Sequence, residues 1–140
     1  MKDYNKSAKT LIEALPYIKK FRGKTIVLKF GGSIGSKEFS NFSRDLVLMK
    51  YVGINPVVVH GGGDEISKAL SKSNIKTSFV DGLRITCDET MKIVETVLGG
   101  KVNNQIVSKI NSNGGSAIGL SGADGELLRV KKMKPIRKGV

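Results

Sequence analysis

The sequence predicts an α/β fold, a three-layer sandwich built around a mainly parallel sheet. The triple valine at residues 57–59 is typical of a strand buried on both faces, and residues 25–30 form a second apolar stretch. Each stretch leads through glycines toward a segment with helical character. Strands that alternate with helices in this way indicate parallel strands joined by right-handed crossovers.

Residues 7–21 are expected to form a helix, because apolar residues recur there at helical spacing. Pro16 lies inside this stretch and should kink the helix or split it in two. The first strand, residues 25–30, is followed by a helix over residues 38–51. Gly53 is a suitable C-cap for that helix, and the second strand follows it closely.

Further elements are expected after the second strand, and turn and capping residues mark their limits. Thr86, with Glu89 three residues later, has the spacing of a capping box. The expected elements are a helix ending near Ser73, a hairpin turning at Asp81-Gly82, a helix after Thr86 interrupted at Gly99-Gly100 and resumed over 102–111, a buried strand over 116–120 and an edge strand over 126–133.

The formal charge of +12 over 140 residues is the most unusual total. Such a field attracts anions, so nucleic acid, anionic lipid and nucleotide phosphates are all candidate partners. The lysines are spread out and tryptophan is absent, which argues against a nucleic-acid-binding domain. No apolar run approaches the ~20 residues that span a membrane. A single cysteine, Cys87, agrees with a reducing compartment. We therefore expect a cytoplasmic protein that binds neither nucleic acid nor membrane.

Two glycine turns follow the expected strands, and both are candidate anion sites. Gly31 and Gly32 come soon after Lys29, while residues 61–63 are a triple glycine that opens a helix. Glycine lets the backbone approach a ligand closely, and a helix N-terminus offers free N–H groups and a positive dipole end. We expect the two turns to lie side by side and to hold the two anions of a phosphoryl transfer.

Other motifs with a known chemistry do not fit this sequence. It contains neither the P-loop pattern nor a glycine pattern that matches the dinucleotide fingerprint. The His60-Gly61-Gly62-Gly63 string resembles an esterase oxyanion segment, but no nucleophile elbow accompanies it. One histidine and one cysteine cannot build a zinc site. His60 is interpreted as a structural hydrogen-bonding group in preference to a general base.

Several strings spread along the chain carry a family resemblance. They are LIEALPYI at 11–18, KFGG at 29–32, YVGINPVVVHGGG at 51–63, FVDGLRIT at 79–86, VLGGKVN at 97–103 and GLSG at 119–122. Together they resemble the amino acid kinase family, and within it the members that act on N-acetyl-L-glutamate. The resemblance implies phosphorylation of the side-chain carboxylate of N-acetyl-L-glutamate, a step of arginine biosynthesis, with ATP and Mg²⁺ as co-substrate.

The resemblance also implies roles for particular residues. They are Lys29 in catalysis, Gly31 and Gly32 in phosphate binding, and Gly62, Gly63 and Arg84 in substrate binding, with no metal ligand in this chain. A lysine is a compact charge suited to a moving phosphoryl group, whereas the planar fork of arginine suits the substrate's α-carboxylate. From the residues alone, Arg84 beside a hairpin turn could equally be an exposed strand residue.

Members of this family are about twice as long as this chain. The resemblance therefore implies an N-terminal helical extension over residues 1–24 and an acceptor-binding lobe over residues 25–140, with the ATP-binding lobe absent. Such a chain is expected to be inactive alone and to need a C-terminal half supplied in trans. The extension and the edge of the central sheet imply a homo-oligomer.

Two departures from the family pattern bear on the site. The loop at residues 33–36 is shorter than usual, and Asp64 stands where many relatives have proline, with a charge that would oppose a nearby anion. The alternative function is a non-catalytic module that binds acetylglutamate or another acidic metabolite. A basic nucleic-acid-binding domain is a third, less favoured reading of the charge.

Overall fold

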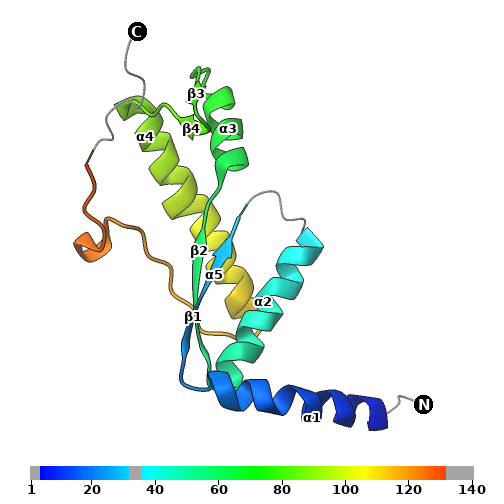
Figure 1. The fold of residues 1–140 in the computed structure, drawn as a ribbon. Coiled ribbons are helices and arrows are strands. Elements are labelled where there is room, and N and C mark those ends of the chain that lie inside the picture. The colour runs from blue at the N-terminus through cyan, green and yellow to red at the C-terminus, as the bar shows by residue number, and fades with distance from the viewer. Residues whose placement is uncertain (1–3, 32–35, 132–140) are drawn as a thin grey trace.

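The structure, a computed structural model, describes residues 4–31 and 36–131 (Figure 1). The predicted Gly32 and most of the loop at 33–36 lie outside the described residues. The elements in chain order are α1 (Tyr4–Phe21), β1 (Thr25–Phe30), α2 (Ser36–Tyr51), β2 (Asn55–His60), α3 (Gly63–Lys72), β3 (Phe79–Val80), β4 (Leu83–Arg84), α4 (Asp88–Glu95), the π-helix η1 (Thr96–Val102), α5 (Asn103–Ser112) and the 3₁₀ turn η2 (Asp124–Glu126).

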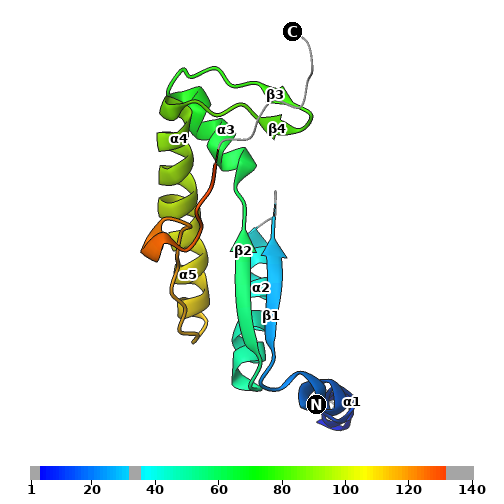
Figure 2. The same cartoon turned by 60° about the vertical axis from the view of Figure 1, so that its left-hand side comes forward.

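Strands β1 and β2 form a parallel pair, which confirms the predicted α/β class. Their register pairs Val27 with Val57 and Phe30 with His60. Helix α2 connects the two strands and packs on β2, and α5 packs on α2 in turn. Figure 2 shows both strands pointing the same way, with α2 running alongside them. The carboxyl ends of the two strands therefore meet at one end of the sheet.

The two faces of the β1–β2 sheet have different surroundings. On one face, the Phe30 ring packs on α2 through Phe39 and Phe42, with ring centroids 5.2 Å and 4.7 Å apart. On the other face the valines are exposed, and 53% of Val59 is accessible to solvent. The expectation that the triple valine is buried on both faces is therefore wrong for the described residues, because helices cover the sheet from one side.

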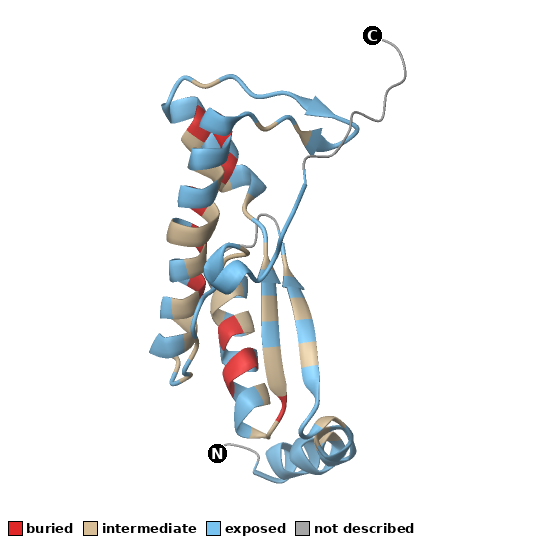
Figure 3. Ribbon diagram, turned by 90° about the vertical axis from the view of Figure 1, so that its left-hand side faces the viewer, coloured by how far each residue is buried: buried red, intermediate tan, exposed pale blue. Residues whose placement is uncertain are grey.

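The main hydrophobic core lies between α3, η1 and α5. Its buried members are Ile66, Leu70, Val97, Val102 and Ile106. Figure 3 shows buried positions along the facing sides of these helices and a separate group on α2. The core thus fixes the helix that follows the triple glycine against the helix that follows the hairpin.

Residues 88–112 form one continuous helical run, in contrast to the predicted interruption at Gly99-Gly100. The glycines lie within η1, so the run widens into π geometry there and then returns to α-helix. A π segment accommodates an extra residue without ending the helix. The predicted N-cap also differs by one position, because Cys87 caps α4 and the Thr86 hydroxyl donates to the Arg84 carbonyl.

The predicted strand at 116–120 is irregular. In the predicted edge strand at 126–133, Glu126 ends the 3₁₀ turn η2 and the other described residues are irregular. Ile118 is 85% exposed. The Asn111 side-chain amide accepts a hydrogen bond from the Ala117 N–H at 2.7 Å and donates to the Ala117 carbonyl at 3.4 Å. These bonds hold the segment beside α5, where its backbone groups pair with an asparagine and not with a neighbouring strand.

Helix α1 extends away from the rest of the described chain (Figure 1). It remains one helix through Pro16, so the predicted split does not occur. None of its residues is buried, and Leu11 and Ile12 are about 70% exposed. No helix within residues 4–31 and 36–131 combines the length and apolar character needed to cross a bilayer.

Candidate anion-binding site at the carboxyl ends of the parallel strands

Gly31, the described residue of the first predicted glycine turn, lies beside the triple glycine at the ends of β1 and β2. Residue pairs Lys29–Val59 and Phe30–His60 are in register, and the Gly61 N–H donates to the Phe30 carbonyl at 3.2 Å. Parallel pairing thus brings Gly31 beside the first residue of the triple glycine. This adjacency is the feature on which a two-anion site depends.

Lys29 lies on the open face of the sheet, one residue before the end of β1. Its side chain is exposed. The Lys29 Cε atom lies 3.9 Å from the position that a β-carbon on Gly31 would occupy, so the side chain runs toward that turn. A lysine in this place carries its charge to the strand ends.

His60 ends β2 and is half-buried. Its Nδ1 atom donates a hydrogen bond to the Gly61 carbonyl at 3.2 Å. This local bond agrees with the interpretation of His60 as a structural group that helps to shape the turn.

The triple glycine leads into α3, whose N-cap is Gly62. No side chain caps this helix end. A β-carbon on Gly62 would lie 2.7 Å from Leu98 Cδ2 and 3.3 Å from Val102 Cγ2, whereas one on Gly61 or Gly63 would meet nothing within 4 Å. Gly62 therefore allows η1 to pack directly on the turn, and Gly63 leaves open space at the start of α3.

Replacing Gly62 by alanine is expected to destabilise the fold by about 1–3 kcal/mol, because the added methyl overpacks against η1. Chemical unfolding of the two proteins measures the change. Gly63→Ala is the matched control and should cost much less, since the space beside it is open. Equal destabilisation by the two substitutions would contradict the packing of η1 on Gly62.

Arg84 reaches this turn from the β3–β4 hairpin. Asp81 and Gly82 both have positive φ, +50° and +77°, which is the geometry of a type I′ turn and confirms the predicted hairpin. The Arg84 Nη2 group donates to Ser67 Oγ at 2.8 Å and to the Gly63 carbonyl at 3.3 Å. The hairpin therefore places a guanidinium group on the first turns of α3, next to the predicted Gly63.

A carboxylate with two lysine partners joins α3 to η1. The Glu65 carboxylate accepts hydrogen bonds from Lys101 Nζ at 2.5 Å and from Lys68 Nζ at 2.9 Å. The bond from Lys101, followed by that from Lys68, lowers the pKa of Glu65 to about 2. The same pairing with Glu65 raises the pKa of Lys68. The two lysines offset the negative charge that Glu65 places in the first turn of α3.

Replacing Lys101 by methionine is expected to move the pKa of Glu65 from about 2 toward its ordinary value of 4.5. A carboxyl pKa that folding lowers adds stability above the unfolded value and loses it as the pH falls through the folded value. For Glu65 this contribution is complete above about pH 4.5 and fades toward pH 2.

Carbon-13 NMR titration of the Glu65 carboxyl measures the shift of its pKa. Lys72→Met, a change at the end of the same helix, should leave the curve in place; an unmoved curve in Lys101→Met would refute the pairing.

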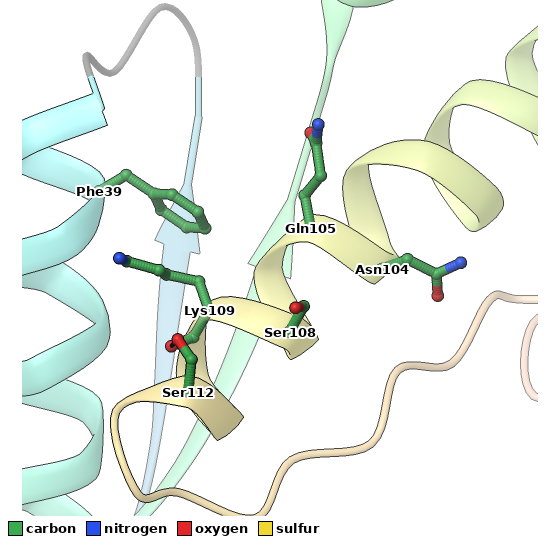
Figure 4. Close-up of a pocket in the computed structure, with 6 residues that line it drawn as sticks. All are labelled: Phe39, Asn104, Gln105, Ser108, Lys109 and Ser112. Atoms are coloured by element: carbon green, nitrogen blue, oxygen red, sulfur yellow. Dashed lines mark hydrogen bonds between the residues drawn. The ribbon is translucent and has the colours of Figure 1, made fainter.

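The described residues form two open pockets, and only one of them adjoins this site. One, of about 550 Å³, is formed between α2 and α5 and contains none of the predicted site residues. Figure 4 shows its lining, with Phe39 from α2 and polar side chains from α5. The other, of about 410 Å³, includes Ser67 and Thr77, which are both hydrogen-bond partners of Arg84. The site is therefore defined by the strand ends and Arg84 and not by an enclosed cavity.

The sequence indicated the glycine turns, Lys29 and Arg84 but not the side-chain contacts of α3 beside them. Glu65 and Lys68 have a helical i,i+3 spacing that could have indicated a pair. Lys101 is 36 positions from Glu65, and no local signal connects them. The sequence likewise gives no sign of the contact between Ser67 and Arg84, because a serine in a helix is usually exposed on the surface.

The parallel strand pair, with glycines after the carboxyl end of each strand, places this chain among the α/β proteins. The amino acid kinase family profile matches residues 24–139. Because this match covers most of the chain, the chain belongs to the amino acid kinase family. Within that family its relatives include acetylglutamate kinases from Saccharophagus degradans and Stutzerimonas stutzeri, which are 60% and 57% identical over 133 residues. The matches cover 94% of this chain and 44% of each relative, so the chain spans less than half of their length.

Solved structures with a similar fold include two of N-acetylglutamate synthase from Neisseria gonorrhoeae. The form with coenzyme A and N-acetyl-glutamate has a TM-score of 0.61 at 21% identity and covers 76% of this chain and 24% of the synthase. The form with coenzyme A and L-arginine has a TM-score of 0.58 at 23% identity and covers 78% of this chain and 25% of the synthase. At these identities the likeness supports the fold alone.

Proposed function

We propose that this chain is the acceptor-binding part of an acetylglutamate kinase. The reaction would transfer a phosphoryl group from ATP to the side-chain carboxylate of N-acetyl-L-glutamate. The adjacency of the β1 and β2 ends carries the proposal, because it brings two glycine turns and Lys29 within one small region. The identity of 60% to an acetylglutamate kinase adds support.

The proposed roles divide the site between two anions. Lys29 would neutralise charge on the phosphoryl group, with Gly31 and Gly32 around the phosphate oxygens. Gly62 and Gly63 would bind the acetylated amino acid. Arg84, which lies against α3 beside Gly63, would bind its α-carboxylate.

The chemistry asks for positioning and charge neutralisation more than for acid–base catalysis. A glutamate side chain has a pKa near ~4.3, so the acceptor is already ionised at neutral pH. No general base is needed to activate it. The obstacle is the repulsion between two anions, which fixed cations and backbone N–H groups offset.

Mg²⁺ would accompany ATP and would not be bound by the residues of this site. The donors near the strand ends are a lysine and backbone N–H groups, which suit phosphate oxygens and not a cation. The described residues hold no cluster of three or more His, Cys, Asp or Glu side chains that could bind a metal ion. The proposal accordingly names no residue of this site as a metal ligand.

The domain division is part of the proposal. Residues 1–24 would form a helical extension, and residues 25–140 would form the acceptor lobe. The ATP lobe would come from a second polypeptide or segment, since the chain spans 44% of its relatives. As a biosynthetic kinase dependent on cellular ATP, the protein would act in the cytoplasm.

A binding experiment and an activity experiment together test the proposal. Calorimetry of the chain with N-acetyl-L-glutamate should show saturable binding, with N-acetyl-L-glutamine as the comparison ligand that lacks only the side-chain carboxylate. A coupled ADP assay should show turnover once the remaining length of the Saccharophagus degradans relative is added as a separate polypeptide. Binding without turnover would favour the alternative, a non-catalytic acetylglutamate-binding module. Failure of both measurements would reject the function.

Helix α1 is expected to mediate homo-oligomer formation. Its apolar residues, including Leu11 and Ile12, are exposed on a helix that has no buried residue of its own. Such a surface is typical of an interaction site. Light scattering on a version lacking residues 1–22 should show a smaller mass than the full chain. The control Lys9→Ala should keep the full-chain mass; an unchanged mass after the deletion would reject α1 as the contact.

A further inference from the structure

The Arg84 guanidinium group is held by side chains from both α3 and its own hairpin. Nη2 donates to Ser67 Oγ at 2.8 Å and to the Gly63 carbonyl at 3.3 Å. Nη1 donates to Thr77 Oγ1 at 3.1 Å. The Phe79 ring lies directly across the hairpin from Arg84, with its centroid 4.6 Å from Arg84 Cζ. An exposed strand arginine with no structural role would not need this set of contacts.

The Ser67 hydroxyl has a fixed orientation. It donates its hydrogen to the Gly63 carbonyl at 3.0 Å, so its lone pairs are left for the Arg84 Nη2 donor. A hydroxyl has one donor hydrogen and two acceptor lone pairs, and both functions are used here. Ser67 thereby links Arg84 to the residue at which α3 begins.

Phe79 restricts the same group in a second direction. An arginine stacked on an aromatic face keeps its plane parallel to the ring and is attracted by the ring quadrupole. Ser67 bonds one nitrogen of the guanidinium, while the Phe79 ring lies against its central carbon. Phe79 itself is 55% exposed, so its contact with Arg84 is not explained by burial in the core.

These contacts leave donors for a ligand. The Ser67 hydroxyl and the Gly63 carbonyl are themselves 3.0 Å apart and can share one Nη2 hydrogen in a three-centre bond. Thr77 takes one Nη1 hydrogen. Of the five N–H groups of arginine, as many as three then remain, which is enough for a bidentate grip on a carboxylate.

We infer that Ser67 and Phe79 are positioning residues that hold Arg84 ready for the carboxylate of an acidic ligand. The inference deepens the proposed function and rests on it for the identity of that ligand. Fixing the guanidinium before binding reduces the side-chain entropy lost when the ligand arrives. Affinity should therefore depend on Ser67 and Phe79, although neither needs to touch the ligand.

The test combines NMR of the Arg84 guanidinium with calorimetry, both on the full chain. Separate Nη1 and Nη2 signals, assigned by their loss in Arg84→Lys, are expected in the unaltered protein and should broaden toward each other in Ser67→Ala as rotation becomes faster. Ser67→Thr should restore them, because a threonine hydroxyl can make the same bond to the carbonyl four residues back. Phe79→Leu should also speed the rotation, and N-acetyl-L-glutamate affinity should fall about fivefold in Ser67→Ala and in Phe79→Leu.

Matched controls come from the same two elements. Ser71→Ala, one turn further along α3, and Val80→Leu, next to Phe79, should change neither the signals nor the affinity. Averaged Arg84 signals in the unaltered protein, or unchanged signals in both Ser67→Ala and Phe79→Leu, would overturn the inference. Loosened Arg84 signals with unchanged affinity would overturn it as well. An unaltered protein that fails to bind N-acetyl-L-glutamate would instead reject the proposed function, and the NMR would still decide whether Arg84 is held.

Discussion

Replacing Lys29 by methionine is expected to lower the phosphoryl-transfer rate about 10²- to 10³-fold, the range for loss of one charge-stabilising group. The measurement is the coupled ADP assay with the remaining length of the relative supplied as a separate polypeptide. Methionine keeps the length and apolar stem of the side chain and removes its charge. Since the proposed role of Lys29 belongs to the phosphoryl group in flight, the turnover number should fall much more than the affinity for N-acetyl-L-glutamate.

Lys24→Met is the matched control for the loss of positive charge. Lys24 lies just before β1, its side chain is exposed, and its backbone carbonyl accepts from the Asn55 N–H whatever its side chain. The general field of this basic chain is reduced equally by both substitutions. A loss of rate shared by Lys24→Met and Lys29→Met would show that the net charge matters and that Lys29 has no special role.

Replacing Arg84 by alanine is expected to weaken N-acetyl-L-glutamate binding about tenfold to a hundredfold, as expected for a charge-assisted, bidentate pair. The substitution removes the guanidinium group that is proposed to bind the carboxylate. It also removes the hydrogen bonds that join the hairpin to α3. Calorimetry measures the change in affinity. Arg84→Lys keeps the charge but not the planar fork, and it should recover little of the loss.

Arg44→Ala is the control for Arg84, because Arg44 is an exposed arginine on α2. Its removal should leave the affinity unchanged. Unfolding measurements on Arg84→Ala show whether the fold is retained while binding is lost. Equal affinities of Arg84→Ala and the unaltered chain would remove Arg84 from the acceptor site.

The sheet and the position of the glycine turns could be predicted because their signals are local. Three valines in a row favour a strand, and glycines directly after a strand favour a turn. Parallel pairing then followed from the intervening helix, and it was confirmed by the register of β1 with β2. The surroundings of the sheet were not predictable in the same way, since exposure of Val59 depends on which elements reach that face.

The segment at 116–120 shows why apolar pattern alone was insufficient. The pattern favours a strand, but a strand also needs a neighbour with unpaired N–H and C=O groups. Asn111 supplies those groups to Ala117 from a side chain, and a pattern of apolar residues does not report such a contact. The site also combines a local signal with a long-range contact. Arg84 was found from its motif, whereas its hydrogen bond to Ser67 joins residues that are 17 positions apart in the chain.

The π-helix η1 sets the rotational phase between α4 and α5. An α-helix turns about 100° per residue, so one residue gained or lost rotates everything beyond it by that angle. With η1 present, Val97 and Ile106 face one core while Lys101 reaches Glu65. Shortening η1 by one residue would rotate α5 and turn Ile106 away from the core that it shares with Ile66 and Leu70 of α3. The phase of one long helix thus determines whether α5 and α3 share a core.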